Sequence, residues 1–201
     1  AEVGARSRSE NLEWSLAIYH ARIRDEFQFI DLGGGNYSVS NADKTVHQGV
    51  EAALAWTWLQ NVFAPADAMD LHLSYTFSDF YFDDDTEWSS NELPGAPRHY
   101  LRTMISYRHA SGIYGGPNLE WGPQAYDVDN ANTRQSKEYA LVGFKLGYQG
   151  NEHWSLFVEG RNLADVNYIA STSVVAIAND SSNVYEPGTG RAVIGGIKLQ
   201  W

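Results

Sequence analysis

Apolar and polar residues alternate along most of the chain with a period of two, which is the period of a β-strand whose two faces meet different surroundings. The first clear example spans residues 12–18, where Leu12, Trp14, Leu16 and Ile18 are separated by polar or small residues. The same pattern recurs over residues 46–58, 69–77, 101–107, 119–121, 140–148, 154–158 and 193–201. The alternation therefore predicts eight strands.

The connections between these segments alternate in length, which is a second and independent pattern. Long polar connections are expected at residues 31–43, 82–97, 127–137 and 168–190, and short ones at 59–67, 109–112 and 149–153. This alternation is typical of an up-and-down antiparallel sheet with one rim of long loops and one rim of tight turns.

The two faces of the predicted strands differ in a way that bears on their surroundings. One face carries the ionisable side chains Glu51, Asp70, His72, Arg102, Arg108, Glu120, Lys145, Glu159, Arg161 and Lys198. The apolar face carries Trp14, Trp58, Tyr107, Tyr148, Trp154 and Trp201, all at the strand ends next to the short connections. A soluble barrel or sandwich would also alternate, but a row of large rings at one level is typical of an interfacial aromatic girdle.

The backbone favours closure in such surroundings, because an unpaired amide in hydrocarbon costs several kcal/mol. We therefore predict an all-β fold, a closed antiparallel up-and-down transmembrane β-barrel of eight strands over residues 11–201. Its first strand would pair with its last. Residues 1–10 are interpreted as a periplasmic lead-in or as the remnant of a preceding strand.

Composition excludes several classes of protein. The chain has 201 residues with 25 Asp and Glu against 14 Lys and Arg, so its net charge of −11 argues against a nucleic-acid partner. There is no Cys, which removes disulfides and thiolate metal sites. The longest uncharged stretch, residues 52–66, has 15 residues and is too short for a membrane-spanning helix.

Several motifs resemble one family. They are Asn91-Glu92-Leu93-Pro94-Gly95-Ala96-Pro97-Arg98-His99, Gly115-Gly116-Pro117 with Glu120-Trp121, Val158-Glu159-Gly160-Arg161-Asn162-Leu163 with Asp165 and Tyr168, and Tyr185-Glu186-Pro187-Gly188-Thr189-Gly190-Arg191. Together they resemble the C-terminal barrel strands of TonB-dependent receptors. The resemblance implies a bacterial outer-membrane protein. It also implies that Val193, Ile197, Leu199 and Trp201 of the last strand are read by the barrel-assembly machinery.

The resemblance further implies a barrel of about 22 strands with a plug, preceded by a short box that contacts TonB, and nothing before Ala1 matches a plug. Two accounts follow. The first is a small structural or surface-interaction barrel that contacts outer-membrane lipid and lipopolysaccharide and, on its own, not TonB. The alternative is a C-terminal fragment of a receptor that imports siderophores or other scarce nutrients.

The interior and the loops complete the expectations. An eight-stranded lumen is filled by side chains, so Glu51, Asp70, Glu120 and Glu159 are expected to pair with Arg102, Arg108, Lys145, Arg161 and Lys198. Asp83, Asp84, Asp85, Glu87, Asp127 and Asp129 are either oxygen ligands for a divalent cation or a solvated acidic rim, and their spacing matches no calcium loop. Ser171, Ser173 and Asp180, with His99, are the candidates for a rim catalytic site. We expect no enzyme activity, no metal site and no cofactor.

Overall fold

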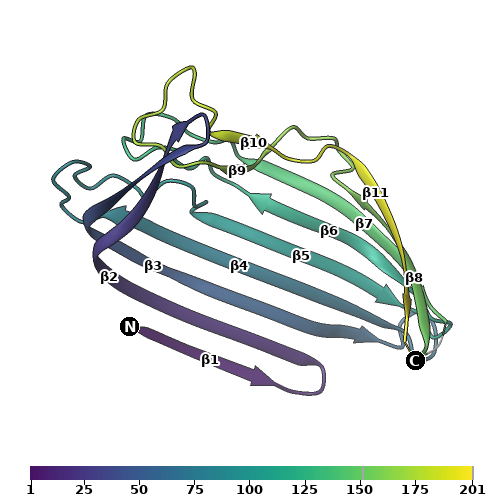
Figure 1. Ribbon diagram of the computed structural model, residues 1–201. Helices are drawn as coiled ribbons and strands as arrows, with labels where there is room; N and C mark the ends of the chain where they lie inside the picture. The colour runs from purple at the N-terminus through teal and green to yellow at the C-terminus, as the bar shows by residue number, and fades with distance from the viewer. Residues whose placement is uncertain (151, 201) are drawn as a thin grey trace.

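The computed structural model describes residues 1–150 and 152–200, and its regular structure is entirely β-strand (Figure 1). The strands are β1 (Glu2–Arg8), β2 (Leu12–Gly33), β3 (Asn36–Gln60), β4 (Ala68–Phe82), β5 (His99–Arg108), β6 (Ile113–Gly122), β7 (Tyr139–Gln149), β8 (Trp154–Arg161), β9 (Ile169–Thr172), β10 (Tyr185–Pro187) and β11 (Ala192–Leu199). Within these described residues, no helix is long and apolar enough to cross a bilayer.

Nine strands form one antiparallel sheet in the order β1-β2-β3-β4-β5-β6-β7-β8-β11, and β9 pairs with β10 in a separate ribbon. The first seven predicted strand segments fall within β2 to β8. Of the last segment, residues 193–199 lie in β11, residue 200 follows that strand, and residue 201 lies outside the described residues. The all-β class and the up-and-down antiparallel order are therefore confirmed.

The predicted closed barrel of eight strands differs from this open sheet. β11 pairs with β8, and β1 pairs with β2 from Glu2↔Tyr19 to Arg8↔Glu13, so β1 occupies the edge of β2 that closure required. Because nine antiparallel strands lie in sequence order, β1 and β11 run in the same direction and cannot join each other by antiparallel pairing. Seven of the first ten residues form β1, and each of them pairs with a residue of β2.

The connection expected at residues 31–43 is mostly strand. β2 and β3 are 22 and 25 residues long and stay in register as far as Asp31↔Tyr37. A tight turn at Gly34 and Gly35 joins them, and both glycines have positive φ angles, 63° and 78°. The hairpin therefore projects well beyond the rest of the sheet before it turns (Figure 1).

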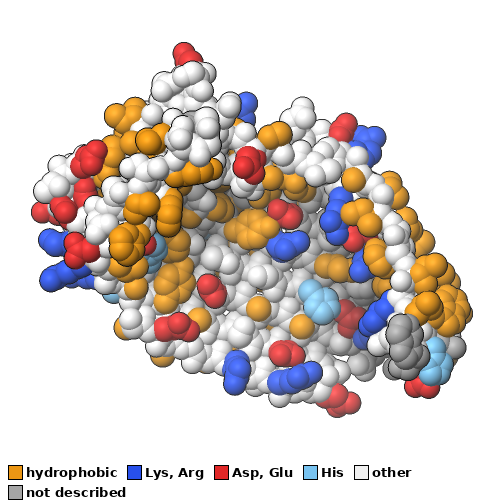
Figure 2. Space-filling model, viewed as in Figure 1, with side chains coloured by type: hydrophobic (Ala, Val, Ile, Leu, Met, Phe, Trp, Pro, Cys, Tyr) orange, Lys and Arg blue, Asp and Glu red, His pale blue; other side chains and the backbone are white. Residues whose placement is uncertain are grey.

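The sheet curves (Figure 1), and its two faces carry different kinds of side chain. The apolar residues predicted for one face remain open on it: Phe144, Leu146 and Val158 are 45%, 48% and 44% exposed. Figure 2 looks into the hollowed face, where charged side chains are scattered among small ones. We call these the convex and concave faces. The compact apolar cluster lies instead among the loops, where Tyr126, Val128, Val175, Ala178 and Val184 pack together.

Candidate functional site

The segments 83–98, 123–138 and 162–191 lie at the end of the sheet that carries the long connections, and we call them the loop cap (Figure 1). Backbone hydrogen bonds join its parts: Gly95 N donates to Asp127 O, and Asn130 N donates to Val175 O. The β2–β3 hairpin is tied to the same unit, because Asp31 N donates to Val174 O. The loop cap is therefore one packed unit.

Asp129 is the central polar side chain of the loop cap and is fully buried. Its carboxylate accepts hydrogen bonds from Thr133 N at 2.8 Å, from Arg134 N at 3.2 Å and from Ala178 N at 2.8 Å, so it joins two loops that are far apart in sequence. Burial works to raise the pKa of Asp129, but these hydrogen bonds outweigh it and hold the pKa below its ordinary 3.8.

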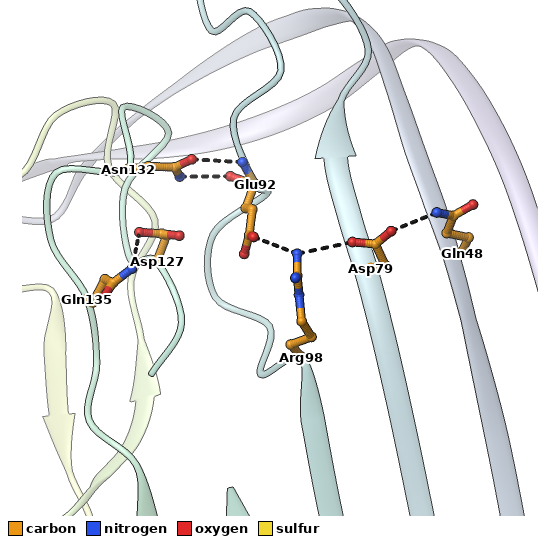
Figure 3. A network of polar contacts seen from close by, with 7 residues as sticks. All are labelled: Gln48, Asp79, Glu92, Arg98, Asp127, Asn132 and Gln135. Atoms are coloured by element: carbon orange, nitrogen blue, oxygen red, sulfur yellow. Dashed lines mark hydrogen bonds and ion pairs between the residues drawn. The ribbon is translucent and has the colours of Figure 1, made fainter. Parts of the chain in front are cut away.

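A second set of contacts fastens the loop cap to the sheet (Figure 3). Arg98 donates to Asp79 of β4 at 3.1 Å and to Glu92 at 2.5 Å, and Asp79 in turn accepts a hydrogen bond from Gln48 of β3. The side chain of Asn132 accepts from Glu92 N and donates to Glu92 O, both at distances below 3 Å. These contacts run from two strands through one loop into the next.

The concave face below the loop cap carries the predicted interior charges as separate pairs. Arg108 binds Asp70 through two hydrogen bonds of 2.5 and 3.0 Å, and Arg161 binds Glu159 at 2.8 Å. Arg102 lies 3.7 Å from Glu120, whereas Lys145 stands over the ring of Phe157. In the part of the chain that the structure describes, Glu51 and Lys198 form no ion pair.

Between these pairs the concave face is hollow. An open cavity of about 1130 Å³ is lined by side chains that include Arg6, Ser15, Ala53, Ser74, Arg102 and Glu120. Strands β1 to β6 contribute to this wall, and most of the side chains between its charges are small. The face therefore presents a broad polar surface, in contrast to the side-chain-filled lumen expected for eight strands.

The predicted aromatic residues lie near the short turns. Tyr148 and Trp154 contact each other with ring centroids 5.5 Å apart, and Trp58 lies 6.4 Å from Trp56. Trp14 pairs with Leu54 and Ser7 in the sheet. Tyr107 donates a hydrogen bond from its hydroxyl to Asp67, which also accepts hydrogen bonds from three backbone amides of its turn; this anchor was not predicted from the sequence. Trp201 lies outside the described residues.

The residues expected to be read by the barrel-assembly machinery lie on the edge strand β11. Val193, Ile197 and Leu199 are between 65% and 75% exposed, which follows from the absence of a neighbour beyond β11 among the described residues.

The candidate catalytic groups are not brought together. Ser171 donates to Glu186, Asp180 binds Arg134, and His99 bonds to Tyr75. The acidic loop residues are also engaged locally, since Asp85 accepts hydrogen bonds from the backbone amides of Asp43, Glu87 and Trp88. Within residues 1–150 and 152–200, no three His, Asp or Glu side chains are grouped as a metal site.

The loop that follows β8 is fixed by Asn162, which lies in the motif identified above but was not expected to have this role. Asn162 is buried, adopts a φ of 48°, and donates to Val166 O and Thr189 O while accepting from Val166 N. Arg191 N donates to Asp165 just before β11. The motif thus shapes the return from β8 to β11.

The family model described as TonB-dependent receptor-like β-barrel matches residues 1–163. The chain belongs to the TonB-dependent receptor family. Proteins of this family are outer-membrane receptors of Gram-negative bacteria, and they are transporters and not enzymes.

Solved receptors share the fold. The ferric yersiniabactin uptake receptor FyuA from Yersinia pestis is 22% identical with a TM-score of 0.71, and the match covers 98% of this chain and 28% of that one. The ferric citrate transporter FecA is 18% identical, with a TM-score of 0.76, 98% of this chain and 30% of that chain covered. The copper transporter OprC is 14% identical, with a TM-score of 0.75 and coverages of 100% and 30%. This chain thus spans less than a third of each.

Proposed function

We propose that this chain is the C-terminal wall of a larger outer-membrane barrel. The observation that carries the proposal is the open sheet, whose edge strands β1 and β11 run in the same direction. Antiparallel completion then requires a partner segment with an odd number of strands, which brings the whole barrel to an even number, as in bacterial outer-membrane proteins. The small self-contained barrel expected from the sequence would need a closed sheet.

The two faces support a placement within that barrel. The convex face would contact lipid, because many of its apolar side chains are exposed. The concave face, with its paired charges and small side chains, would line the interior. The aromatic residues at the short turns would then lie at the periplasmic interface, and the loop cap would face the cell exterior.

The role of the assembled barrel would be import of a metal or metal chelate. Three features support this role: family membership, the large concave hollow, and a loop cap that several side chains hold together at one end of the same sheet. The named relatives take up ferric yersiniabactin, ferric citrate and copper. The loop cap and the upper concave wall would form one side of the entrance for such a ligand.

Import is tested in cells that carry or lack the full-length gene. Ferric citrate, a ferric catecholate complex and a copper salt are supplied separately, and cell-associated metal is measured by mass spectrometry. We expect one of these to accumulate only with the gene present and only without an uncoupler of the proton gradient. Asp129→Asn should lower that accumulation several-fold by loosening the loop cap, whereas Asp84→Asn at an exposed loop position should not. Receptor-independent accumulation of all three would refute the proposal.

A further inference from the structure

Three cations gather on the convex face where β2 and β3 leave the apolar band. Arg24 and Lys44 are direct partners across the two strands, and Arg22 lies two residues from Arg24 on the same face. All three are exposed. Figure 2 shows Lys and Arg side chains clustered at the left edge of the view, near the place where β2 and β3 bend in Figure 1.

These cations have no ionic partner in the part of the chain that the structure describes. Across the residues that the structure describes, none of the three forms an ion pair or a side-chain hydrogen bond. The adjacent carboxylate of Asp43 instead accepts hydrogen bonds from Thr86. Like charges directly opposite each other destabilise a ladder, because their Cβ atoms lie only about 5 Å apart. In a chain with a net charge of −11, such a group of unpaired cations indicates an anion that neutralises it.

The height of the cluster indicates what kind of anion this is. Ile18, Val50 and Phe77 are partners in register and form the last row of the convex face in which all three residues are apolar. The next row is the polar set His20, Gln48 and Asp79, and the row above it joins Arg22 to Val46 and Tyr81. Arg22 is four residues above Ile18, or roughly 9 Å in height for a strand with a rise of about 3.3 Å and a tilt of about 45°. That is the level of headgroups above a hydrocarbon core.

We propose that Arg22, Arg24 and Lys44 form a binding site for the phosphate groups of lipopolysaccharide, with the acyl chains of that lipid lying against the apolar convex face below. The cluster lies directly above the apolar band, which favours a lipid as the ligand. A lipid would contact both the cations and the apolar side chains, whereas a free anion would contact the cations alone. The proposal rests on the convex face lying in the membrane and is independent of import.

The test uses the full-length receptor in detergent, freed of bound lipid, with purified lipopolysaccharide as the probe. Replacing all three residues with Gln should weaken binding on the order of a hundredfold, since each Lys or Arg near an anionic membrane surface contributes about fivefold. The charge-matched control replaces Arg6, Arg8 and Lys198 of the concave face with Gln and should leave affinity unchanged. Enzymatically dephosphorylated lipopolysaccharide should bind the unaltered receptor as weakly as intact lipid binds the triple variant.

Equal affinity of the triple variant and the unaltered receptor would overturn the proposal, as would an equal loss in the control. Competition by inorganic phosphate at the concentrations at which lipopolysaccharide binds would assign the cluster to a free anion and would also overturn it. Should the triple variant fail to fold, Lys44→Gln alone should still lower affinity about fivefold. If the convex face itself proved not to contact lipid, that result would count against the proposed placement of the sheet in the membrane.

Discussion

Replacing Leu73 with Arg tests which face of the sheet meets lipid. Leu73 is the middle of five alternate apolar positions of β4, four residues from Met69 and four from Phe77. With a rise of about 3.3 Å and a tilt of about 45°, each end lies roughly 9 Å above or below Leu73, which places it near the midplane of an apolar band about 25 Å tall. An Arg at that depth costs about 2–4 kcal/mol.

The measurement is urea unfolding of the full-length receptor in vesicles of short-chain phosphatidylcholine, followed by tryptophan fluorescence. Leu73→Arg should lower the free energy of unfolding by about 2–4 kcal/mol, and Phe77→Arg near the interface by no more than about 1 kcal/mol. His72→Arg is the matched control, because His72 is next to Leu73 in β4 and its side chain therefore lies on the opposite, concave face; it should change stability by less than about 1 kcal/mol. A neutral Leu73→Arg, or a His72→Arg of equal cost, would refute the facing of the strands.

Three further predictions concern polar anchors. Because the pKa of Asp129 is lowered in the folded protein, its contribution to stability is complete above the ordinary value of 3.8 and declines as pH falls through the lowered pKa. The rate of hydrogen exchange in residues 123–138 should therefore rise at that low pH. Asp129→Asn should raise the same exchange rate already at pH 7. Arg108→Ala leaves Asp70 without its main partner and should cost on the order of 1.5–3 kcal/mol in urea unfolding, whereas Arg108→Lys should cost less. Asn162→Ala removes three hydrogen bonds at a positive φ and should increase protease cleavage between β8 and β11, with cleavage between β6 and β7 unchanged.

Alternation predicted the strands from β2 to β8 and β11 because each separates two unlike surfaces, and a period of two is then required. It failed where that contrast is weak. In β1 the apolar face is reduced to Val3 and Ala5, and the segment was interpreted as a lead-in or remnant. The upper part of the β2–β3 hairpin is polar or mixed on both faces, so the pattern predicted a loop at residues 31–43.

The prediction of a closed barrel rested on the free-energy cost of unpaired backbone groups in lipid, and it counted eight strands where the sheet has nine. Once β1 is included, the sheet has nine strands and antiparallel self-closure is impossible. The ion pairs were only partly predictable for a related reason, because register decides which charges meet. Glu51 lies opposite Ala17 and Thr76, so no cation is its direct neighbour.

The loop anchors were beyond the reach of the sequence. Asp129 is one of several acidic loop residues, and nothing local distinguishes it from Asp127 or Asp84. One of its partners, Ala178, is 49 residues away, so only the packing of two loops reveals the contact. Asn162 lay within a recognised motif, but its role depends on Thr189, 27 residues later.

The central claim is that β1 and β11 pair with further strands and not with each other. Residues 1–201 contain no Cys, so no native cysteine of this segment competes with an introduced pair. In the full-length receptor in the outer membrane, Ala5→Cys combined in turn with Val193→Cys, Gly195→Cys or Ile197→Cys should form no intramolecular disulfide. Val158→Cys with Gly195→Cys, which are partners in the β8–β11 ladder, should form one. A disulfide within one chain between β1 and β11 would contradict the account.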